Sequence, residues 1–217
     1  PDIFADKLSV IDYERFEIVN QVPVDPVGDA DNVSPWMDTV SWDGSTLLVE
    51  NNEGDTGTES IWDISDPAEP EEVARLTADD GLGELPLTSE IGPDSETAYV
   101  FTANSEDVSV IDLTENEVTG RIDLGGSAFV GTWNPARTKL YVPVQTSDEV
   151  KVIDHAAGEI VETISVGSKP YGATAGFVRP ETDTSSNLLA SLAALGIDLP
   201  GNGTSYCIGN CHCGHHV

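Results

Sequence analysis

ETAYVFTANSEDVSVID at residues 96–112 and TKLYVPVQTSDEVKVID at residues 138–154 share one pattern. Each stretch holds two runs rich in β-branched and aromatic residues, separated by a short polar segment, which predicts a β-hairpin. Tyr99 lies 13 residues before Asp112, and Tyr141 lies 13 residues before Asp154. The matched offset indicates that the two stretches are copies of one structural unit.

The marker of this unit, Val-Ile-Asp or its variant Ile-Trp-Asp, occurs four times. It ends at Asp12, Asp63, Asp112 and Asp154, at intervals of 51, 49 and 42 residues. Three copies are whole, with turn residues and two strand-like runs before the marker and another run after it. They cover about residues 36–76, 88–122 and 129–165. Four short strands in a unit of roughly 40 to 50 residues are typical of a propeller blade.

We therefore expect an all-β protein, a β-propeller with three whole four-stranded blades and one shared or incomplete blade. Residues 7–22 supply only the last two strands of a blade, and residues 171–178 only the first strand of another. A propeller needs about four or more blades, so the predicted ring is not complete. Either the chain is incomplete at its N-terminus, or neighbouring copies of itself complete the ring in a homo-oligomer or filament.

The repeats carry a family resemblance. The segments 96–112 and 138–154 resemble the YVTN family of β-propeller repeats, and Val166-Gly167-Ser168-Lys169-Pro170-Tyr171-Gly172 is similar to that family's link between blades. The resemblance covers residues 7 to about 178. Trp62-Asp63-Ile64-Ser65-Asp66-Pro67 looks more like related propeller repeats of surface proteins. The resemblance implies an extracellular or cell-surface protein, a sensor or an electron-transfer module, and the fold does not select among these.

The charge balance excludes some partners. The sequence has 39 acidic and 9 basic side chains, so the formal net charge is -30. The acid is spread along the chain, which disfavours binding to nucleic acid or to anionic membranes. No apolar run approaches the roughly 20 residues of a membrane-spanning helix, so no membrane insertion is expected. The composition resembles that of proteins from haloarchaea and other extreme halophiles, in which concentrated salt screens the repulsion.

The sequence changes character after the repeats. We expect a propeller domain at residues 1–178 and a second region at 179–217, with a linker, a short helix at 187–195 and a tail rich in Cys and His. All three Cys and three of the four His lie within ten residues, namely Cys207, Cys211, His212, Cys213, His215 and His216. Thiolates and imidazoles together predict a bound metal or haem.

The leading interpretation of the tail is haem attachment. Cys207-Ile208-Gly209-Asn210-Cys211-His212 resembles a c-type haem motif, although the common form has two residues between the Cys. The resemblance implies thioether bonds from Cys207 and Cys211, and His212 as the proximal iron ligand. His215 or His216 would then bind a neighbouring haem, or the same iron if the backbone folds back. The resemblance therefore implies an exported electron-transfer protein that carries haem c and exchanges electrons with a redox partner.

Other interpretations stay open. Cys207, Cys211 and His215 have the spacing of the copper loop in cytochrome oxidase subunit II and nitrous oxide reductase, although the expected Met is missing. The cluster, with Cys213, could instead hold a structural Zn or Cu ion, form disulfides, or bind nothing. The alternative function is a non-enzymatic surface or filament protein with a structural metal site. No phosphate loop, nucleophile elbow or zinc-protease motif occurs, which favours a protein that is not an enzyme.

Several other residues have structural interpretations. We expect His155 to lie in a turn, and the four marker Asp residues to accept turn hydrogen bonds. The acidic loops 25–31 and 50–55 could supply hard oxygen ligands for Ca²⁺. The four tryptophans are expected to pack within and between blades, namely Trp36, Trp42, Trp62 and Trp133.

Overall fold

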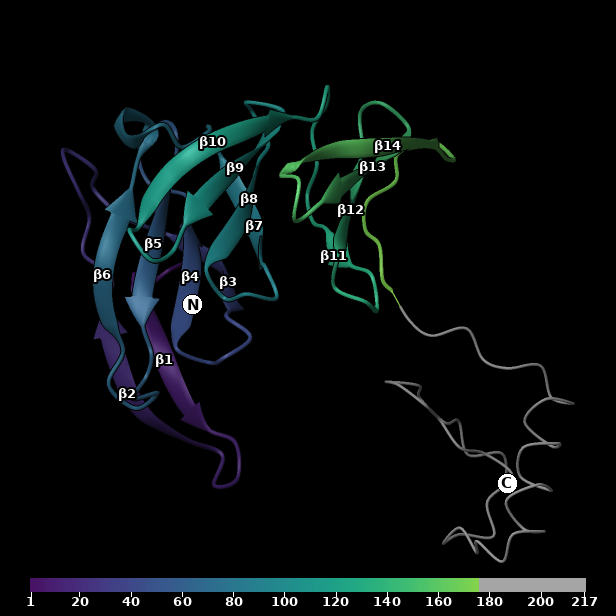
Figure 1. Ribbon diagram of the computed structural model, residues 1–217. Helices are drawn as coiled ribbons and strands as arrows, with labels where there is room; N and C mark the ends of the chain where they lie inside the picture. Colours follow the sequence, from purple (N-terminus) through teal and green to yellow (C-terminus); the bar gives the residue numbers. More distant parts are fainter. Residues whose placement is uncertain (176–217) are drawn as a thin grey trace, which may run out of the picture. The chain divides into compact units, whose positions relative to one another are not determined.

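The computed structural model describes residues 1–175 of the chain. These residues form fourteen β-strands, arranged in one two-stranded and three four-stranded sheets with antiparallel neighbours (Figure 1). The only helix among them is the single 3-10 turn η1 (Ala78–Asp80), so no described helix could cross a membrane. The all-β prediction is therefore confirmed.

The strands follow one another in chain order within every sheet. The N-terminal hairpin contains β1 (Lys7–Asp12) and β2 (Glu17–Pro23). The first four-stranded sheet contains β3 (Pro35–Val40), β4 (Thr46–Asn51), β5 (Thr58–Asp63) and β6 (Glu71–Leu76). The second contains β7 (Pro86–Ile91), β8 (Thr97–Thr102), β9 (Asp107–Asp112) and β10 (Glu117–Asp123). The third contains β11 (Thr132–Trp133), β12 (Lys139–Val144), β13 (Glu149–Asp154) and β14 (Glu159–Ser165).

These bounds confirm the three predicted four-stranded units and the two-stranded unit at residues 7–22. The strand expected at residues 171–178 is not found in its described part, because residues 171–175 form no strand. A strand needs a partner for its N–H and C=O groups, and no further strand follows within residues 1–175. The Tyr171 ring instead stacks on Phe129, with the ring centroids 4.9 Å apart.

The marker Asp residues close the turns that follow their strands. Each accepts a hydrogen bond from a backbone N–H two or three residues later. Asp112, for example, accepts from the backbone N–H of Thr114 at 2.8 Å and from the Thr114 hydroxyl at 2.6 Å. An Asp carboxylate that accepts from backbone N–H groups of the following turn stabilises the turn, and this role needs no bound ligand. This confirms the structural role predicted for Asp12, Asp63, Asp112 and Asp154.

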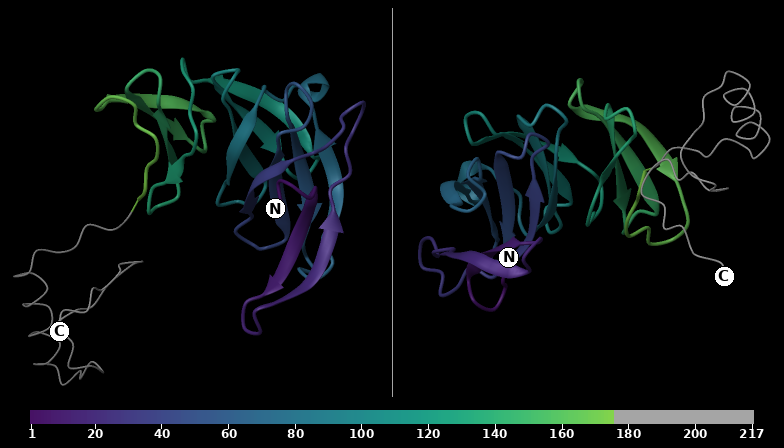
Figure 2. Two further views of the ribbon diagram at one scale, coloured as in Figure 1. Left: turned by 180° about the vertical axis from the view of Figure 1, so that it is seen from behind. Right: turned by 90° about the horizontal axis from the view of Figure 1, so that it is seen from below.

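The core consists of three apolar clusters, one at each interface between neighbouring sheets. Leu48 and Val49 are neighbours on β4 but belong to different clusters, as do Ala98 and Tyr99 on β8, because successive side chains of a strand point to opposite faces. The first cluster joins the N-terminal hairpin to the first sheet through Leu8, Val24, Val33, Val49 and Trp62. Figure 2 shows this hairpin beside that sheet. The second joins the first and second sheets, and the third joins the second and third.

The tryptophans divide into two groups. Trp62 and Trp133 are buried between sheets, as expected. Trp36 and Trp42 stay about half exposed, so neither is enclosed in the core as Trp62 and Trp133 are. Trp42 lies at a sheet junction, where its Nε1–H donates to the Ile91 carbonyl at 3.0 Å and the Arg137 guanidinium covers its ring at 3.7 Å. These two contacts satisfy the indole N–H and cover one ring face, so a partly exposed Trp42 is stable at this junction.

Apolar side chains remain exposed at both ends of this series of sheets. On the N-terminal hairpin and just before it they are Phe4, Ile11, Tyr13, Phe16, Ile18 and Val19. After β13 they are Val161, Ile164, Val166 and Tyr171. The described sheets do not close into a ring.

Residues 1–174 form one compact unit. The boundary predicted after residue 178, the helix predicted at 187–195 and the Cys/His tail all lie outside the described residues. They stay predictions from the sequence.

Candidate functional site

The residues of the predicted haem or metal site are not described by the structure. Cys207, Cys211, His212, Cys213, His215 and His216 all lie beyond residue 175. Among residues 1–175, no three His, Cys, Asp or Glu side chains come together in an arrangement that could hold a metal ion. The described ionisable groups that carry chemical interest form three centres: an open pocket, a polar chain between two sheets, and a buried acidic cluster.

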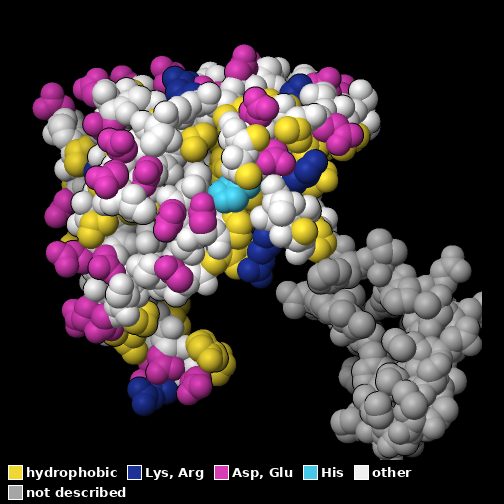
Figure 3. Space-filling view, viewed as in Figure 1, with side chains coloured by type: hydrophobic (Ala, Val, Ile, Leu, Met, Phe, Trp, Pro, Cys, Tyr) yellow, Lys and Arg dark blue, Asp and Glu magenta, His cyan; other side chains and the backbone are white. Residues whose placement is uncertain are grey.

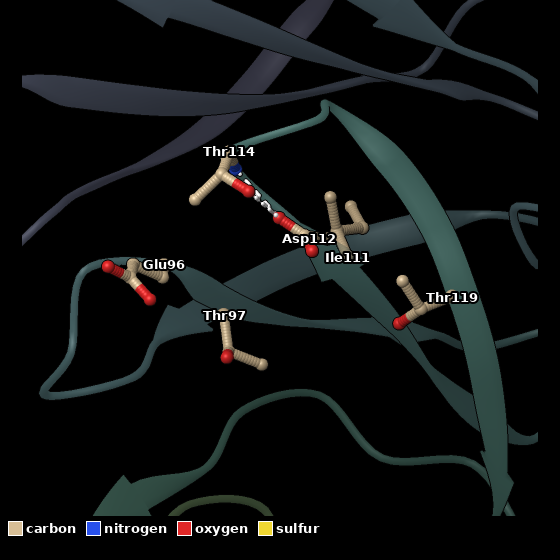
Figure 4. Close-up of a pocket in the computed structure, with 6 residues that line it drawn as sticks. All are labelled: Glu96, Thr97, Ile111, Asp112, Thr114 and Thr119. Carbon is tan, nitrogen blue, oxygen red and sulfur yellow. Dashed lines mark hydrogen bonds between the residues drawn. The ribbon is translucent and has the colours of Figure 1, made fainter.

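The open pocket lies beside the β9–β10 turn of the second sheet (Figure 4). Its only carboxylates are those of Glu96 and Asp112. The Thr114 hydroxyl and backbone N–H both donate to Asp112 and hold the pKa of its carboxyl below the usual value. Asp112 is therefore committed to the turn, which leaves Glu96 as the other carboxylate of the pocket.

A chain of three polar side chains connects the second and third sheets. Asp94 lies in the turn before β8, Tyr99 lies on β8, and His155 lies in the turn after β13. His155 Nε2 is 3.1 Å from Asp94 Oδ2, and His155 Nδ1 is 2.9 Å from the Tyr99 hydroxyl oxygen. A carboxylate only accepts, so we assign a proton to Nε2; in the neutral imidazole, Nδ1 then accepts from the Tyr99 O–H.

The surroundings of this chain are tight. The Trp133 ring meets the His155 ring edge-on, with centroids 5.5 Å apart. Gly92 lies so close that a Cβ there would come within 2.8 Å of His155 Cε1 and 2.7 Å of Asp94 Oδ1. The sequence predicted the turn position of His155 correctly and missed its two partners. Gly92 was the one sign of this contact in the sequence, because only a residue without a side chain leaves room for the His155 ring. That sign can be interpreted only when the packing of the two sheets is known.

Burial sets the protonation states here. Burial, together with Asp94 and Asp154, raises the pKa of Tyr99 to about 12, so its hydroxyl stays neutral. Burial also raises the pKa of Glu90, the cross-strand neighbour of Tyr99, to about 7, against a smaller lowering by the Trp133 indole. Tyr99 is only 1% exposed, so its hydroxyl cannot reach a substrate. The three side chains Asp94, His155 and Tyr99 therefore connect the second and third sheets.

At Asp94, hydrogen bonds outweigh the effect of burial on the pKa. Burial raises the pKa of that carboxyl, but hydrogen bonds from the backbone N–H groups of Glu96 and Thr97 and from the Thr97 hydroxyl outweigh it. The His155 ring adds to the lowering. The net pKa of Asp94 is lowered, and the carboxyl is ionised at neutral pH.

The third centre is acidic and lies in the first sheet. Glu53 follows β4, and its carboxylate accepts from the Thr58 hydroxyl and from the Arg75 guanidinium, each at 2.7 Å. Arg75 is almost fully buried and also forms a two-pronged ion pair with Glu72. The same carboxylate of Glu53 accepts from the Val27 N–H at 2.6 Å, which ties the predicted acidic loop 25–31 to the sheet.

The first two residues of the other predicted acidic loop, 50–55, lie in a strand and not in a loop. Glu50 and Asn51 belong to β4, and Glu50 pairs across the sheet with Glu59 of β5. Both carboxylates are completely buried. This pair was missed because neither residue stands out in a sequence with 39 acidic side chains.

No protein-family model and no curated protein matches the sequence. Solved structures do match. The Kuenenia stuttgartiensis hydrazine synthase has 24% identity and a TM-score of 0.61, over 74% of this chain and 43% of that one. The Pseudomonas aeruginosa periplasmic gluconolactonase PpgL has 17% identity and a TM-score of 0.60, over 79% of this chain and 51% of that one. These likenesses show a propeller-like, all-β fold.

A third match is a functionally unknown protein from Desulfotomaculum acetoxidans, with 18% identity and a TM-score of 0.52, over 77% of this chain and 66% of that one. The chain thus spans between 43% and 66% of the length of these structures. At such identities the likeness concerns the fold alone, and function must be argued from the residues of this chain.

Proposed function

We propose that the chain is an exported electron-transfer protein, in which a β-propeller scaffold carries a c-type haem at Cys207, Cys211 and His212. The observation that carries the proposal is the gathering of all three Cys and three of the four His within residues 207–216. Thiols placed before a His supply both covalent attachment and an axial iron ligand. Attachment of this type takes place outside the cytoplasm, which is why the protein is proposed to be extracellular or attached to the cell surface.

In this proposal each part has its own task. Bound haem would supply one-electron chemistry. Cys207 and Cys211 would hold it covalently, His212 would ligate the iron, and His215 or His216 would offer a further imidazole. The packed sheets of residues 1–174 would present a docking surface for a redox partner.

The decisive experiment is a pair of absorption spectra, oxidised and dithionite-reduced, with denaturing mass spectrometry on the same full-length sample. We expect c-type bands and a haem mass increment that survives denaturation. A Cys207→Ala, Cys211→Ala variant should lose both, whereas the control Cys213→Ala should keep both. A colourless protein without the added mass overturns the proposal.

A second candidate rests on the exposed apolar ends of the sheet series. Ile11 and Ile18, which face each other on the N-terminal hairpin, are 61% and 59% exposed. Exposed patches of this kind mark interaction surfaces. On this candidate, neighbouring copies of the chain complete the propeller in a homo-oligomer or filament, and the Cys/His tail holds a structural Zn or Cu ion.

The two candidates differ in simple measurements. The second expects a colourless protein whose Zn or Cu leaves with a chelator, and a mass in solution above that of one chain. An Ile11→Asp, Ile18→Asp variant should then lower that mass to one chain. A monomer at all concentrations contradicts the second candidate.

The net charge of -30 supports one more property of either candidate. Asp and Glu side chains are spread over the face shown in Figure 3, with few Lys or Arg between them. We infer that the protein works in concentrated salt, in an archaeal or other halophilic host, because screening at about 1 M ionic strength shortens the Debye length to about 3 Å.

A further inference from the structure

Two carboxylates face each other inside the first sheet. Glu50 on β4 and Glu59 on β5 are cross-strand partners, and neither side chain has any exposed area. Side chains that are directly opposite in an antiparallel pair have Cβ atoms about 4.5–5.5 Å apart, so the two carboxyl groups are neighbours. Both share a strand face with Leu48 and Ile61, which belong to the apolar cluster between the first and second sheets.

The oxygens of this pair have no hydrogen-bond partners in the described part of the chain. All four carboxylate oxygens are unpartnered, and so is the hydroxyl of Ser89 on β7, which is 4% exposed. Ser89 lies beside Glu50 closely enough to lower the pKa of that carboxyl, although its geometry falls short of a hydrogen bond. Five buried oxygens, from both sheets, are therefore left unsatisfied, and native proteins rarely tolerate this.

The protein's own charges do not compensate the pair. Arg75 acts on Glu59, but its guanidinium is engaged by Glu53 and Glu72. The negative charge of Asp38 raises the pKa of Glu50, and the charge of Glu50 raises the pKa of Glu59. Buried carboxylates without a partner are unfavourable, so the pair must be neutralised either by protons or by a bound cation.

The fold itself does not require acid at these positions. The register of the second sheet places Phe101 opposite Val108 at the equivalent site, and the third sheet places Pro143 opposite Val150. An apolar pair therefore serves the same packing purpose in two of the three sheets. Glu50 and Glu59 are a departure confined to the first sheet.

We propose that Glu50 and Glu59, with the Ser89 hydroxyl, bind one divalent hard cation of the Ca²⁺ class between the first and second sheets. Carboxylate and hydroxyl oxygens are the ligands that such ions prefer. Two carboxylates balance a charge of +2, which explains why this site needs only two acidic residues. The ion would connect β4 and β5 of the first sheet to β7 of the second.

The test uses the full-length protein after exhaustive dialysis against EDTA. Titration calorimetry with Ca²⁺, Mg²⁺ and Mn²⁺ is run at about pH 7.5 in about 1 M KCl, where a Debye length of about 3 Å suppresses diffuse binding to surface acid. We expect one ion per chain, and an unfolding midpoint higher by about 5–10 °C at a hundredfold excess over Kd. The Cys/His tail prefers softer ions, so its occupancy is separable from this site.

Three variants and a control sharpen the result. Glu50→Gln, Glu59→Gln should lose stoichiometric binding, and Ser89→Ala should weaken it by about tenfold. Glu50→Phe, Glu59→Val copies the pair of the second sheet; it should fold, bind no ion, and show no change of midpoint with Ca²⁺. The control Glu115→Gln, Glu117→Gln removes the same charge from exposed positions and should bind as the parent does.

Two outcomes overturn the proposal. One is the absence of stoichiometric binding of all three ions by the parent protein. The other is equal binding by the parent and by the Phe/Val variant. In either case the carboxyls are neutralised by protons, and infrared spectra of the parent at the same pH should show a carboxylic-acid C=O band that the Phe/Val variant lacks.

Discussion

The Tyr99 hydroxyl of the second sheet lies 2.9 Å from His155 Nδ1 of the third sheet, although the two residues are 56 positions apart in the chain. The opposite ring nitrogen of His155 meets Asp94, which precedes the strand of Tyr99. One imidazole thus connects two parts of the second sheet to the third. Apolar packing supplies most of the attraction between these sheets, and this contact helps to fix how they align.

Tyr99→Phe removes the hydroxyl and keeps the ring in the core. We expect the free energy of unfolding to fall by about 1 kcal/mol, because one partly buried hydrogen bond is lost and His155 loses a partner. Denaturant unfolding in concentrated salt measures the change. Tyr141→Phe, at the equivalent position on β12, is the matched control and should have a smaller effect. Equal effects of the two substitutions would mean that the Tyr99–His155 contact adds nothing.

Glu90 makes stability depend on pH. Its pKa in the folded protein is raised to about 7, so its favourable contribution is complete below about pH 4.5 and is lost as the pH rises through about 7. Glu90→Gln mimics the protonated carboxyl. We expect it to match the parent near pH 4.5 and to be more stable at about pH 8 by on the order of 1–3 kcal/mol.

The measurement for Glu90 is the difference in unfolding free energy between variant and parent at several pH values, since Glu50 and Glu59 also have raised pKa values. The exposed Glu115→Gln controls for the loss of one negative charge. A difference that stays constant across the pH range from acid to mildly basic would falsify the assignment of this pH dependence to Glu90.

Gly131 lies at a tight contact between the second and third sheets. A Cβ there would lie 2.8 Å from Phe101 Cζ and 2.9 Å from Leu140 Cδ1. Gly131→Ala should cost about 1–3 kcal/mol through overpacking. A Cβ added at Gly120 would meet no atom within 4 Å, so Gly120→Ala should be neutral or slightly stabilising. If both substitutions are neutral by chemical denaturation, the sheets are less tightly packed than the structure indicates.

Salt should control the stability of the whole protein. With a net charge of -30, self-repulsion is strong at low ionic strength and is screened at high ionic strength. We expect the unfolding midpoint to rise between about 0.1 and about 3 M KCl, and dialysis to low salt to unfold the chain. Circular dichroism follows both changes. Unchanged stability at low salt would remove the halophilic interpretation and leave the other proposals standing.

Local patterns were enough to locate the sheets. The alternation of residues 96–112 and its copy at 138–154 placed the hairpins of β8–β9 and β12–β13, since strand periodicity and turn chemistry act over a few residues. The Asp markers predicted their own turn hydrogen bonds for the same reason. The strand expected from residue 171 failed in its described part, because a strand depends on a neighbour that the local sequence cannot supply.

The polar centres depended on how the sheets pack. His155 was placed correctly in a turn, but its bonds to Tyr99 and Asp94 exist only because the third sheet packs on the second. Glu50 and Glu59 were two acidic residues among many, and only the register of β4 with β5 and the cover of the second sheet made them a buried pair. Repeats, strands and turns could be read directly from the chain because they follow from local periodicity. Which ionisable groups lose their water, and which neighbours they then meet, depends on contacts between residues that are far apart in the sequence.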